Sequence, residues 1–343
     1  MKSTAVVILN WNGRKYLEKF LPLVVEHSSA LADVVVIDNA SKDDSIAFIR
    51  EEFPSVTIIE LSKNYGFAKG YNMGLAQVKH EFLVLLNSDV EVTPGWIEPL
   101  LEYMEAEPSM AACQPKILDY NRKTHFEYAG AAGGYMDQDG FVFCAGRIFN
   151  AFEEDQGQYT ENQEVFWASG AALFIRRHAF NEVGGLDEDF YAHMEEIDLC
   201  WRLKNRGYSI GSCRSSHVYH VGGGTLDRLN PLKTYLNFRN NLYMLLKNYR
   251  NGSVLLKLIR RMFLDGIAAF RFLMEGKLTY FLAVLRAHFT FYGNLRLMLR
   301  KRKSEADLGT KVNLTGMYKK SIITQFFLKK NANFSSLSKS DFF

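Results

Sequence analysis

Residues 82–91 read Phe-Leu-Val-Leu-Leu-Asn-Ser-Asp-Val-Glu, an apolar run that ends abruptly in a polar and acidic cluster. An uninterrupted apolar run is typical of a strand that is buried on both faces of a parallel sheet. In such sheets ligands bind beyond the carboxyl ends of the strands, which is where Asp89 stands. We therefore expect Asp89 to hold a metal ion or a charged substrate. The alternative is an ordinary strand-to-loop turn, because Asn, Ser and Asp are common turn residues.

Three further runs of β-branched or aliphatic residues precede this one, and segments with helical spacing separate them. The runs cover residues 4–10, 34–38 and 56–60. Strands that alternate with helices predict βαβ units. The chain is therefore predicted to have an α/β fold with a mainly parallel central sheet that is flanked by helices.

The helices of this region have recognisable start signals. Residues 41–44, Ser-Lys-Asp-Asp, have the form of a capping box that opens a helix over residues 43–52. The Thr-Pro pair at residues 93–94 makes a good N-cap and first helical residue for a helix that runs to about Glu105. Residues 113–163 lack such regularity, because glycines, aromatics and acidic residues interrupt the pattern. We predict a loop-rich insertion there.

The composition of the 343-residue chain fits a large globular protein, because 48% of its residues are hydrophobic. The longest apolar runs fall far short of the ~20 residues that cross a bilayer, and no signal peptide is evident. The four cysteines form no C-x-x-C pair. Their arrangement argues against a zinc knuckle or a disulfide framework and favours a reducing cytoplasm.

Charge and periodicity divide the chain into three parts. Residues 1–249 contain 23 Lys and Arg against 33 Asp and Glu, whereas residues 250–330 contain 17 against 4. We expect a main domain over residues 1–249, a helical extension over residues 250–303 and a poorly ordered tail over residues 304–343, where periodicity is weak.

The helical extension begins with a basic amphipathic helix. Lys257, Arg260 and Arg261 fall on one helical face of residues 254–263, and aliphatic residues fall on the other. A cationic face is suited to anionic lipid, so we expect residues 254–303 to contact a membrane surface. The alternative is that these helices pack on the main domain or on another subunit.

Two further polar segments follow predicted strands. Asp38 closes the second strand, so its carboxylate can share a crevice with Asp89 and accept hydrogen bonds from the base or ribose of a nucleotide. The alternative role of Asp38 is a cap before Ser41. Residues 64–74 place three glycines and two asparagines between a strand and a helix, which allows a ligand to approach the backbone closely. The alternative is a simple turn and helix start.

Six motifs stand along the first 202 residues. They read Val-Val-Ile-Leu-Asn-Trp-Asn-Gly at residues 6–13, Val-Ile-Asp-Asn-Ala-Ser at 36–41, Asn-Tyr-Gly-Phe-Ala-Lys-Gly at 64–70, Leu-Asn-Ser-Asp at 86–89, Gly-Gly-Leu-Asp-Glu at 184–188 and Glu-Glu-Ile-Asp-Leu-Cys-Trp-Arg at 195–202. In this order they resemble family 2 glycosyltransferases, and the chain resembles the rhamnosyltransferase-like branch over about residues 3–250. The resemblance implies the GT-A fold of nucleotide-diphospho-sugar transferases and a role in building bacterial surface polysaccharides.

The resemblance also implies which residues bind the donor and the metal. Residues 87–89 fill the family's D-x-D position, with Asn87 in place of the first Asp. Asp89 would bind Mg²⁺ or Mn²⁺ together with His220, although a histidine before a glycine turn is otherwise structural. The residues expected to bind the nucleoside-diphosphate sugar donor are Asn10, Asp38, Asn64, Gly70, Asn72, Asn87 and Ser88.

Catalytic and acceptor-binding residues follow from the later motifs. A helix predicted over residues 195–206 begins with Glu195 and Glu196, the family's acidic pair, in which the second residue is the catalytic base. Here Glu196 replaces the more familiar Asp. Acidic residues at a helix start otherwise interact favourably with the helix dipole. Trp167 and Gly170 resemble the segment on the acceptor side, where an aromatic ring can stack on a sugar, although tryptophan is usually buried.

These implications predict an inverting, metal-dependent transfer of a hexose or a deoxyhexose such as rhamnose. The donor would be a nucleoside-diphosphate sugar, and the acceptor would be a hydroxyl of a glycan or a lipid-linked saccharide. We expect a cytoplasmic enzyme that is peripheral at the inner face of the cell membrane. Two other classes are a non-enzymatic sugar-nucleotide-binding regulator and a nucleic-acid-binding protein. The retained carboxylates argue against the first, and the lack of a recognised reading module argues against the second.

Overall fold

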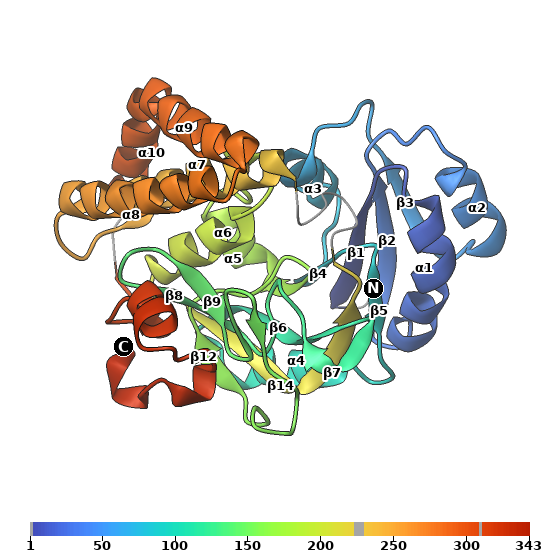
Figure 1. Cartoon of the computed structure of the whole chain (residues 1–343). Coiled ribbons are helices and arrows are strands. Elements are labelled where there is room, and N and C mark those ends of the chain that lie inside the picture. The colour runs from blue at the N-terminus through green and yellow to red at the C-terminus, as the bar shows by residue number, and fades with distance from the viewer. Residues whose placement is uncertain (1–2, 223–229, 309–310) are drawn as a thin grey trace.

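The structure, a computed structural model, describes residues 3–222, 230–308 and 311–343. A ten-stranded sheet forms its centre (Figure 1), and every strand on its main path is parallel to the others except β12 and β13. The path runs β12 (Gln163–Val165), β14 (Ser209–His220), β6 (Met110–Asp119), β13 (Ala172–Arg176), β4 (Phe82–Leu86), β1 (Thr4–Asn10), β2 (Ala32–Asp38) and β3 (Thr57–Glu60). The short strands β5 (Val90–Val92) and β7 (Arg122–Phe126) pair with β14 and β6. The predicted α/β fold with a mainly parallel sheet is confirmed.

Two layers of helices cover this sheet, because its strands carry apolar residues on both faces. Leu17 of α1, Ile49 of α2 and Leu100 of α4 pack on one face. Tyr71 of α3 and Ile197 of α6 belong to the core on the other face, and α5 lies on that side as well. The bounds are α1 (Arg14–Ser28), α2 (Ser45–Glu52), α3 (Phe67–Leu75), α4 (Glu98–Ala106), α5 (Arg177–Glu182) and α6 (Glu195–Lys204).

Strand predictions hold better than helix starts. β1 and β4 have the predicted bounds, whereas α2 begins at Ser45 and α4 begins at Glu98. Ser41 does not cap α2, because its backbone N–H and its hydroxyl both donate to Asp38. Thr93 does not cap α4 either, since its hydroxyl donates to the carbonyl of His217 at 2.7 Å. In both cases a tertiary contact outweighs the local capping signal.

Residues 113–163 are not the predicted loop-rich insertion. They continue β6 and then build most of a second, five-stranded sheet. Its order is β11 (Ala151–Phe152), β10 (Arg147–Ile148), β9 (Val142–Cys144), β8 (Gly134–Asp137) and β15 (Met317–Tyr318). The strands have two to four residues each, which is too short for a periodic pattern to stand out in the sequence.

The end of the chain also differs from the expected poorly ordered tail. Met317 pairs with Met136 across the small sheet, and the rings of Phe334 and Phe342 lie 4.7 and 5.3 Å from that of Tyr135. Irregularly spaced aromatic residues bury much apolar surface without any helical or strand period. Weak periodicity was therefore a poor guide to order here, and the three-part division of the chain stays a prediction.

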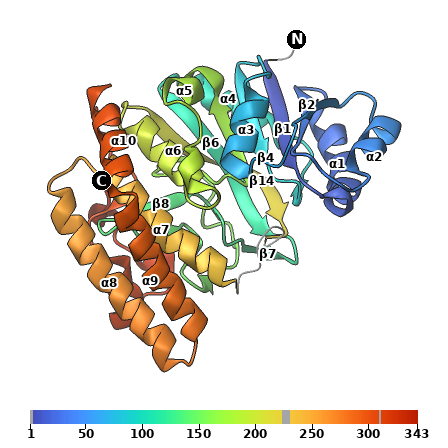
Figure 2. The same cartoon turned by 90° about the horizontal axis from the view of Figure 1, so that it is seen from above.

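Four helices form an extension at the end of the molecule that lies away from α1 and α2 (Figure 2). They are α7 (Pro231–Asn248), α8 (Val254–Met274), α9 (Leu278–Gly293) and α10 (Leu295–Asp307). α7 packs against α9 and α10, and α8 packs against α9. None of the helices in the described ranges has both the length and the hydropathy that a membrane span requires.

Candidate active site

Polar side chains singled out from the sequence gather at one edge of the central sheet. β1, β2 and β4 run parallel, and their carboxyl ends lead into Asn10, Asp38 and residues 87–89. The register places Asn10 opposite Asp38, and the backbone N–H of Asn87 donates to the carbonyl of Ala171 at 3.0 Å. Asn87 and Ser88 are partly buried there. The structure thus brings these residues together where parallel sheets bind ligands.

Asp38 is buried and is held by its neighbours. Asn10 donates from Nδ2 to Asp38 Oδ1 at 3.0 Å, and Ser41 donates from its backbone N–H to Oδ2 at 2.9 Å and from its hydroxyl to Oδ1 at 2.5 Å. An ionised carboxylate has about four acceptor positions, so Asp38 can still accept a hydrogen bond from a ligand. Ser41 therefore orients Asp38 at the sheet edge.

Asn64 and Gly70 shape the loop after β3. Asn64 Oδ1 accepts from Asn39 Nδ2 at 3.1 Å and from the N–H of Gly66 at 2.8 Å. A Cβ on Gly70 would lie 3.0 Å from Asn39 Nδ2 and 3.1 Å from Leu9 Cδ1, so only glycine fits this buried position without displacing a neighbour. The contacts of both residues in the structure are internal, and a direct contact with the donor stays a prediction.

Asn72 joins two of the sequence motifs. Its side chain donates to the carbonyl of Leu186 at 2.8 Å and accepts from the N–H of Leu186 at 3.0 Å. Because both polar atoms of this amide are used, Asn72 anchors residues 184–188 to α3. Its expected contact with the donor likewise stays a prediction.

Asp89 and His220 contact one another, and their role as metal ligands stays a prediction. β5 pairs with the end of β14 so that His220 stands opposite Val90, and His220 Nε2 lies 3.2 Å from Asp89 Oδ1. On the other side of the ring, His220 Nδ1 lies 3.4 Å from Oε2 of Glu127, a buried residue. The imidazole is therefore held between two carboxylates.

The charges of this triad depend on one another. Burial disfavours the charged imidazole, but the carboxylates of Glu127 and Asp89 outweigh burial and raise the pKa of His220 to about 10. Burial also raises the pKa of Asp89, yet the hydrogen bond and the charge of His220 leave it below its usual value, and the pKa of Glu127 is lowered in the same way. Glu127 could not be found from the sequence, because no spacing relates it to the residues it meets.

The donor set of this triad fits a divalent cation that takes part of its shell from a substrate. The described ranges contain no group of three or more His, Cys, Asp or Glu side chains that could by itself hold a metal ion. One carboxylate and one imidazole suit Mg²⁺ or Mn²⁺ when phosphate oxygens and water supply the remaining ligands, and His220 would have to release its Nε2 proton as the ion binds. Glu127 would then fix the orientation of the imidazole, as carboxylates commonly do beside metal-binding histidines.

Glu196 lies at the same edge of the sheet, at the start of α6. A Cβ on Gly170 would lie 3.5 Å from the Cβ of Glu196, and Gly170 immediately precedes Ala171, the partner of Asn87. Glu196 is partly buried, and burial raises its pKa to about 7. Its Oε2 accepts no hydrogen bond from the part of the chain that the structure describes. A carboxylate of this kind is suited to accept a proton near neutral pH.

Glu195 differs from its neighbour. It is 5% exposed, and burial together with the charge of Glu196 raises its pKa well above the usual value. Its Oε2 is also without a hydrogen-bond partner among the described residues. Burial and the neighbouring charge thus disfavour the ionised form of Glu195.

The backbone before α6 is strained and is held by α7. Tyr191, His193 and Met194 have φ angles of 66°, 67° and 73°, which non-glycine residues rarely adopt. The Nδ2 of Asn240 donates to three carbonyls within residues 190–193, at 3.0, 2.9 and 2.7 Å. Strain of this kind persists only where the surroundings fix it, and it is typical of functional sites. The role of Asn240 was not evident from the sequence either.

Trp167 is not available to stack on a sugar, which corrects the acceptor-site prediction. It is 3% exposed, and its Nε1 donates to the carbonyl of Tyr135 at 2.9 Å. Gly134 packs so closely on the indole that a Cβ would lie 2.2 Å from ring atoms. Trp167 supports the fold behind the site, whereas Gly170 lies beside Glu196.

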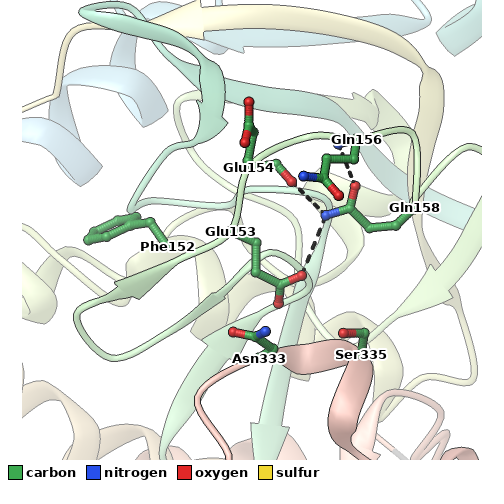
Figure 3. A pocket seen from close by; sticks show the side chains of 7 residues that line it. All are labelled: Phe152, Glu153, Glu154, Gln156, Gln158, Asn333 and Ser335. Carbon is green, nitrogen blue, oxygen red and sulfur yellow. Dashed lines mark hydrogen bonds between the residues drawn. The ribbon is translucent and has the colours of Figure 1, made fainter.

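A separate pocket of about 370 Å³ lies between β11 and the end of the chain (Figure 3). Its polar side chains bond to one another, since Gln158 Nε2 donates to the carbonyl of Glu154 at 2.7 Å and to Glu153 Oε2 at 3.5 Å. It contains none of the site residues expected from the sequence. The residues that line it are Phe152, Glu153, Glu154, Gln156, Gln158, Asn333 and Ser335.

The chain is similar in sequence to known proteins. Residues 5–184 match the sequence profile of Glycosyl transferase family 2. N-acetylglucosaminyl-diphospho-decaprenol L-rhamnosyltransferase of Mycobacterium tuberculosis is 25% identical over 265 residues, which cover 72% of this chain and 85% of that protein. The low-salt glycan biosynthesis hexosyltransferase Agl10 of Haloferax volcanii is 23% identical over 288 residues, which cover 80% of this chain and 86% of that protein.

A solved structure shares the fold. The mannosyltransferase PcManGT from Pyrobaculum calidifontis, in complex with GDP-Man and Mn²⁺, aligns with a TM-score of 0.52 and 14% identity. The alignment covers 89% of this chain and 80% of that one. The GT-A fold and the family resemblance predicted from the sequence are confirmed.

Proposed function

The chain belongs to glycosyl transferase family 2 and is a glycosyltransferase, and we propose that it transfers a hexose or deoxyhexose with inversion from a nucleoside-diphosphate sugar. The acceptor would be a hydroxyl of a glycan or of a lipid-linked saccharide in bacterial cell-surface polysaccharide synthesis. One observation carries the proposal. Glu196 presents a carboxylate oxygen without a hydrogen-bond partner among the described residues, beside Gly170 and on the sheet edge that holds Asp89.

Glu196 is the proposed general base. Its carboxylate takes the proton of the acceptor hydroxyl while the acceptor oxygen forms a bond to the anomeric carbon. The bond from that carbon to the diphosphate oxygen breaks on the opposite face, so a single displacement inverts the configuration. A base with a pKa of about 7 is about half ionised at neutral pH, more so above it, and still basic enough to accept the proton. Glu195, whose pKa burial and the charge of Glu196 raise, is assigned a supporting role beside it.

Asp38 and Asn10 are proposed to receive the nucleoside, because their side chains stand together at the ends of β2 and β1. Asp89 and His220 would hold Mg²⁺ or Mn²⁺. Such an ion, when bound, supplies positive charge against the charge that develops on the leaving diphosphate. Glu127 keeps the ring of His220 in the orientation that turns Nε2 towards Asp89.

The acceptor class is the less constrained part of the proposal. The Mycobacterium relative is named for an acceptor that consists of a sugar on a polyprenyl diphosphate. An acceptor of that class lies at a membrane surface, so we propose that this enzyme works as a peripheral protein at the cytoplasmic face of the cell membrane. Residues 254–303 are the part of the chain proposed to make that contact.

Release of nucleoside diphosphate from a panel of sugar nucleotides tests the function directly. The panel holds dTDP-rhamnose, UDP-hexoses and UDP-N-acetylhexosamines, each with and without Mg²⁺ or Mn²⁺ and with saccharide acceptors. The Glu196→Gln variant is expected to lose about 10²- to 10⁴-fold in kcat, the usual contribution of a general base, while it still binds the donor. Glu195→Gln is the matched control. A Glu196→Gln enzyme with wild-type kcat would place the base elsewhere, and no release with any donor would favour a non-enzymatic nucleotide-binding protein.

A further inference from the structure

The basic face of α8 points towards the protein and not towards solvent, contrary to the expectation for a cationic membrane helix. Arg260 Nε lies 2.8 Å from Oδ1 of Asp139, a fully buried residue, and Lys257 Nζ lies 3.9 Å from the same oxygen. Arg261 is buried and pairs with Asp265 at 2.7 Å. Lys257 and Arg261 are therefore turned towards the protein, whereas Arg260 pairs with Asp139 from the edge of this face and keeps 52% of its side chain exposed.

The opposite face of α8, continued by α9, exposes an unusual number of large apolar side chains. They recur every three or four residues, which is the spacing of one helical face. In both views α8 and α9 lie side by side at the outer end of the molecule (Figures 1 and 2), and we treat their two exposed apolar faces together. The residues of these faces, here called the apolar surface, are Leu255, Leu256, Ile259, Phe263, Ile267, Phe270 and Met274 of α8 and Leu278, Leu282, Leu285, Phe289 and Tyr292 of α9.

The exposure of these residues is too high for an ordinary helix face. Phe263 is 68% exposed, Met274 is 72% exposed and Phe289 is 73% exposed. Apolar side chains that are exposed in a contiguous patch mark an interaction site. Scattered single residues would need no such explanation.

Charge at the border of the apolar surface identifies the partner. Within residues 254–303 the exposed cations are Arg260, Arg271, Lys277, Arg286, Arg296, Arg300 and Lys303, whereas Glu275 is the exposed acid. Glu275 is already paired with Arg271 and Lys277 at 2.8 and 2.7 Å. A second copy of this chain would bring like charges together. An anionic bilayer instead accepts apolar side chains and attracts the cations at their border.

We propose that the apolar surface of α8 and α9 inserts into the acyl boundary of an anionic lipid bilayer, with the bordering cations at the headgroups. The inference deepens the proposed function and rests on it for the location of the acceptor. α7 connects this surface to the site, because it packs against α9 and its Asn240 holds the backbone before Glu196. Burial of apolar side chains supplies most of the proposed membrane binding, and attraction between the cations and the anionic headgroups adds to it.

Vesicle flotation of the full chain tests the proposal without any catalytic step. The wild type is expected to float with vesicles of phosphatidylcholine and phosphatidylglycerol and to keep most of that binding in about 0.5 M NaCl, where screening weakens charge attraction. The variant Phe263→Ser, Phe270→Ser, Phe289→Ser is expected to lose at least about 100-fold in partitioning, since burial of one phenylalanine corresponds to about tenfold or more. Its melting temperature and its nucleoside diphosphate release with a water-soluble acceptor should match those of the wild type.

Lys257→Gln is the matched control on the face of α8 that is turned towards the protein. It is expected to lower the melting temperature, because Asp139 stays buried, and to leave flotation within about twofold. Flotation of the triple serine variant at the wild-type level would overturn the insertion. A second result would also overturn it. In that result the wild type does not float and forms a dimer by light scattering, whereas the serine variant is monomeric. Flotation needs no donor sugar, so membrane insertion and sugar transfer are tested separately. Either proposal can fail while the other holds.

Discussion

Lys301 of α10 forms an ion pair with Asp187, which lies 114 positions earlier in the chain and only eight before Glu195. Asp187 also pairs with Lys247 of α7 at 2.5 Å. Burial by itself would raise the pKa of Asp187, but the charges of Lys247 and Lys301 outweigh it and hold the pKa below its ordinary value. Two helices of the extension are thereby tied to the loop that leads to the proposed base.

The two lysines are expected to differ in their contribution to stability. Lys247 is 2% exposed and also pairs with the buried Asp198, so Lys247→Ala should lower the free energy of unfolding by about 3–5 kcal/mol. The side chain of Lys301 is 28% exposed, and Lys301→Ala should cost about 1 kcal/mol or less. Urea denaturation of both variants measures the difference, and Lys301→Arg is the control that keeps the charge. Equal losses for the two alanine variants would contradict this order.

Activity is expected to fall as the pH drops below about 7. Glu196 can accept a proton only when it is ionised, and burial raises its pKa to about 7. kcat should therefore decrease about tenfold per unit of pH on the acidic side and level off above neutrality. The profile of Glu195→Gln should keep this fall on the acidic side, because Glu196 is still present in that variant. A kcat that is constant from pH 5 to pH 8 would exclude Glu196 as the base.

Glu127 is expected to support the cation although it does not bind it. Glu127→Gln removes the carboxylate beside His220 Nδ1 and should weaken the apparent affinity for Mg²⁺ or Mn²⁺ about 10- to 100-fold. Titration of nucleoside diphosphate release with the metal measures this shift. Glu91→Gln is a matched control, because Glu91 lies in β5 close to Asp89 but pairs with Lys123. If both variants titrate like the wild type, Glu127 has no part in metal binding.

Trp167 is expected to affect stability and not acceptor binding. Trp167→Phe removes the hydrogen bond to Tyr135 and leaves part of a buried space empty, which should cost about 1–3 kcal/mol. The KM for the acceptor should stay within about twofold of the wild-type value. Trp11→Phe is the control, because Trp11 is 51% exposed and its replacement should not change the melting temperature. An acceptor KM that rises with no loss of stability would return Trp167 to the acceptor site.

The strands were predictable because they lie in the middle of the sheet. β1 and β4 are wholly or almost wholly buried, so an apolar run of their length has only one interpretation. The positions of Asp38 and Asp89 followed from the same reasoning, since each stands at or just beyond the end of such a run. The order of the six motifs then indicated the family to which the chain belongs.

Other features depend on contacts that no local pattern contains. Glu127 meets His220 only because β7 and β14 both border β6, and Asn240 reaches the loop before α6 from a separate helix. The helical period correctly grouped the basic residues of α8 on one face. The helical period does not show which face of α8 is buried. That depends on the buried Asp139 and Asp265, with which the basic residues pair.

The parallel pairing of β15 with β8 has a consequence for synthesis of the protein. The N–H of Ile322 donates to Asp137, 185 residues earlier, and Phe143 stacks near Tyr318 and Phe334. A nascent chain on the ribosome can complete the central sheet at residue 220 but must keep the edge of the small sheet open for about another hundred residues. During that interval Tyr135 and Phe143 are open to chaperones and proteases. The small sheet can thus be completed only after the helices of the extension have been translated.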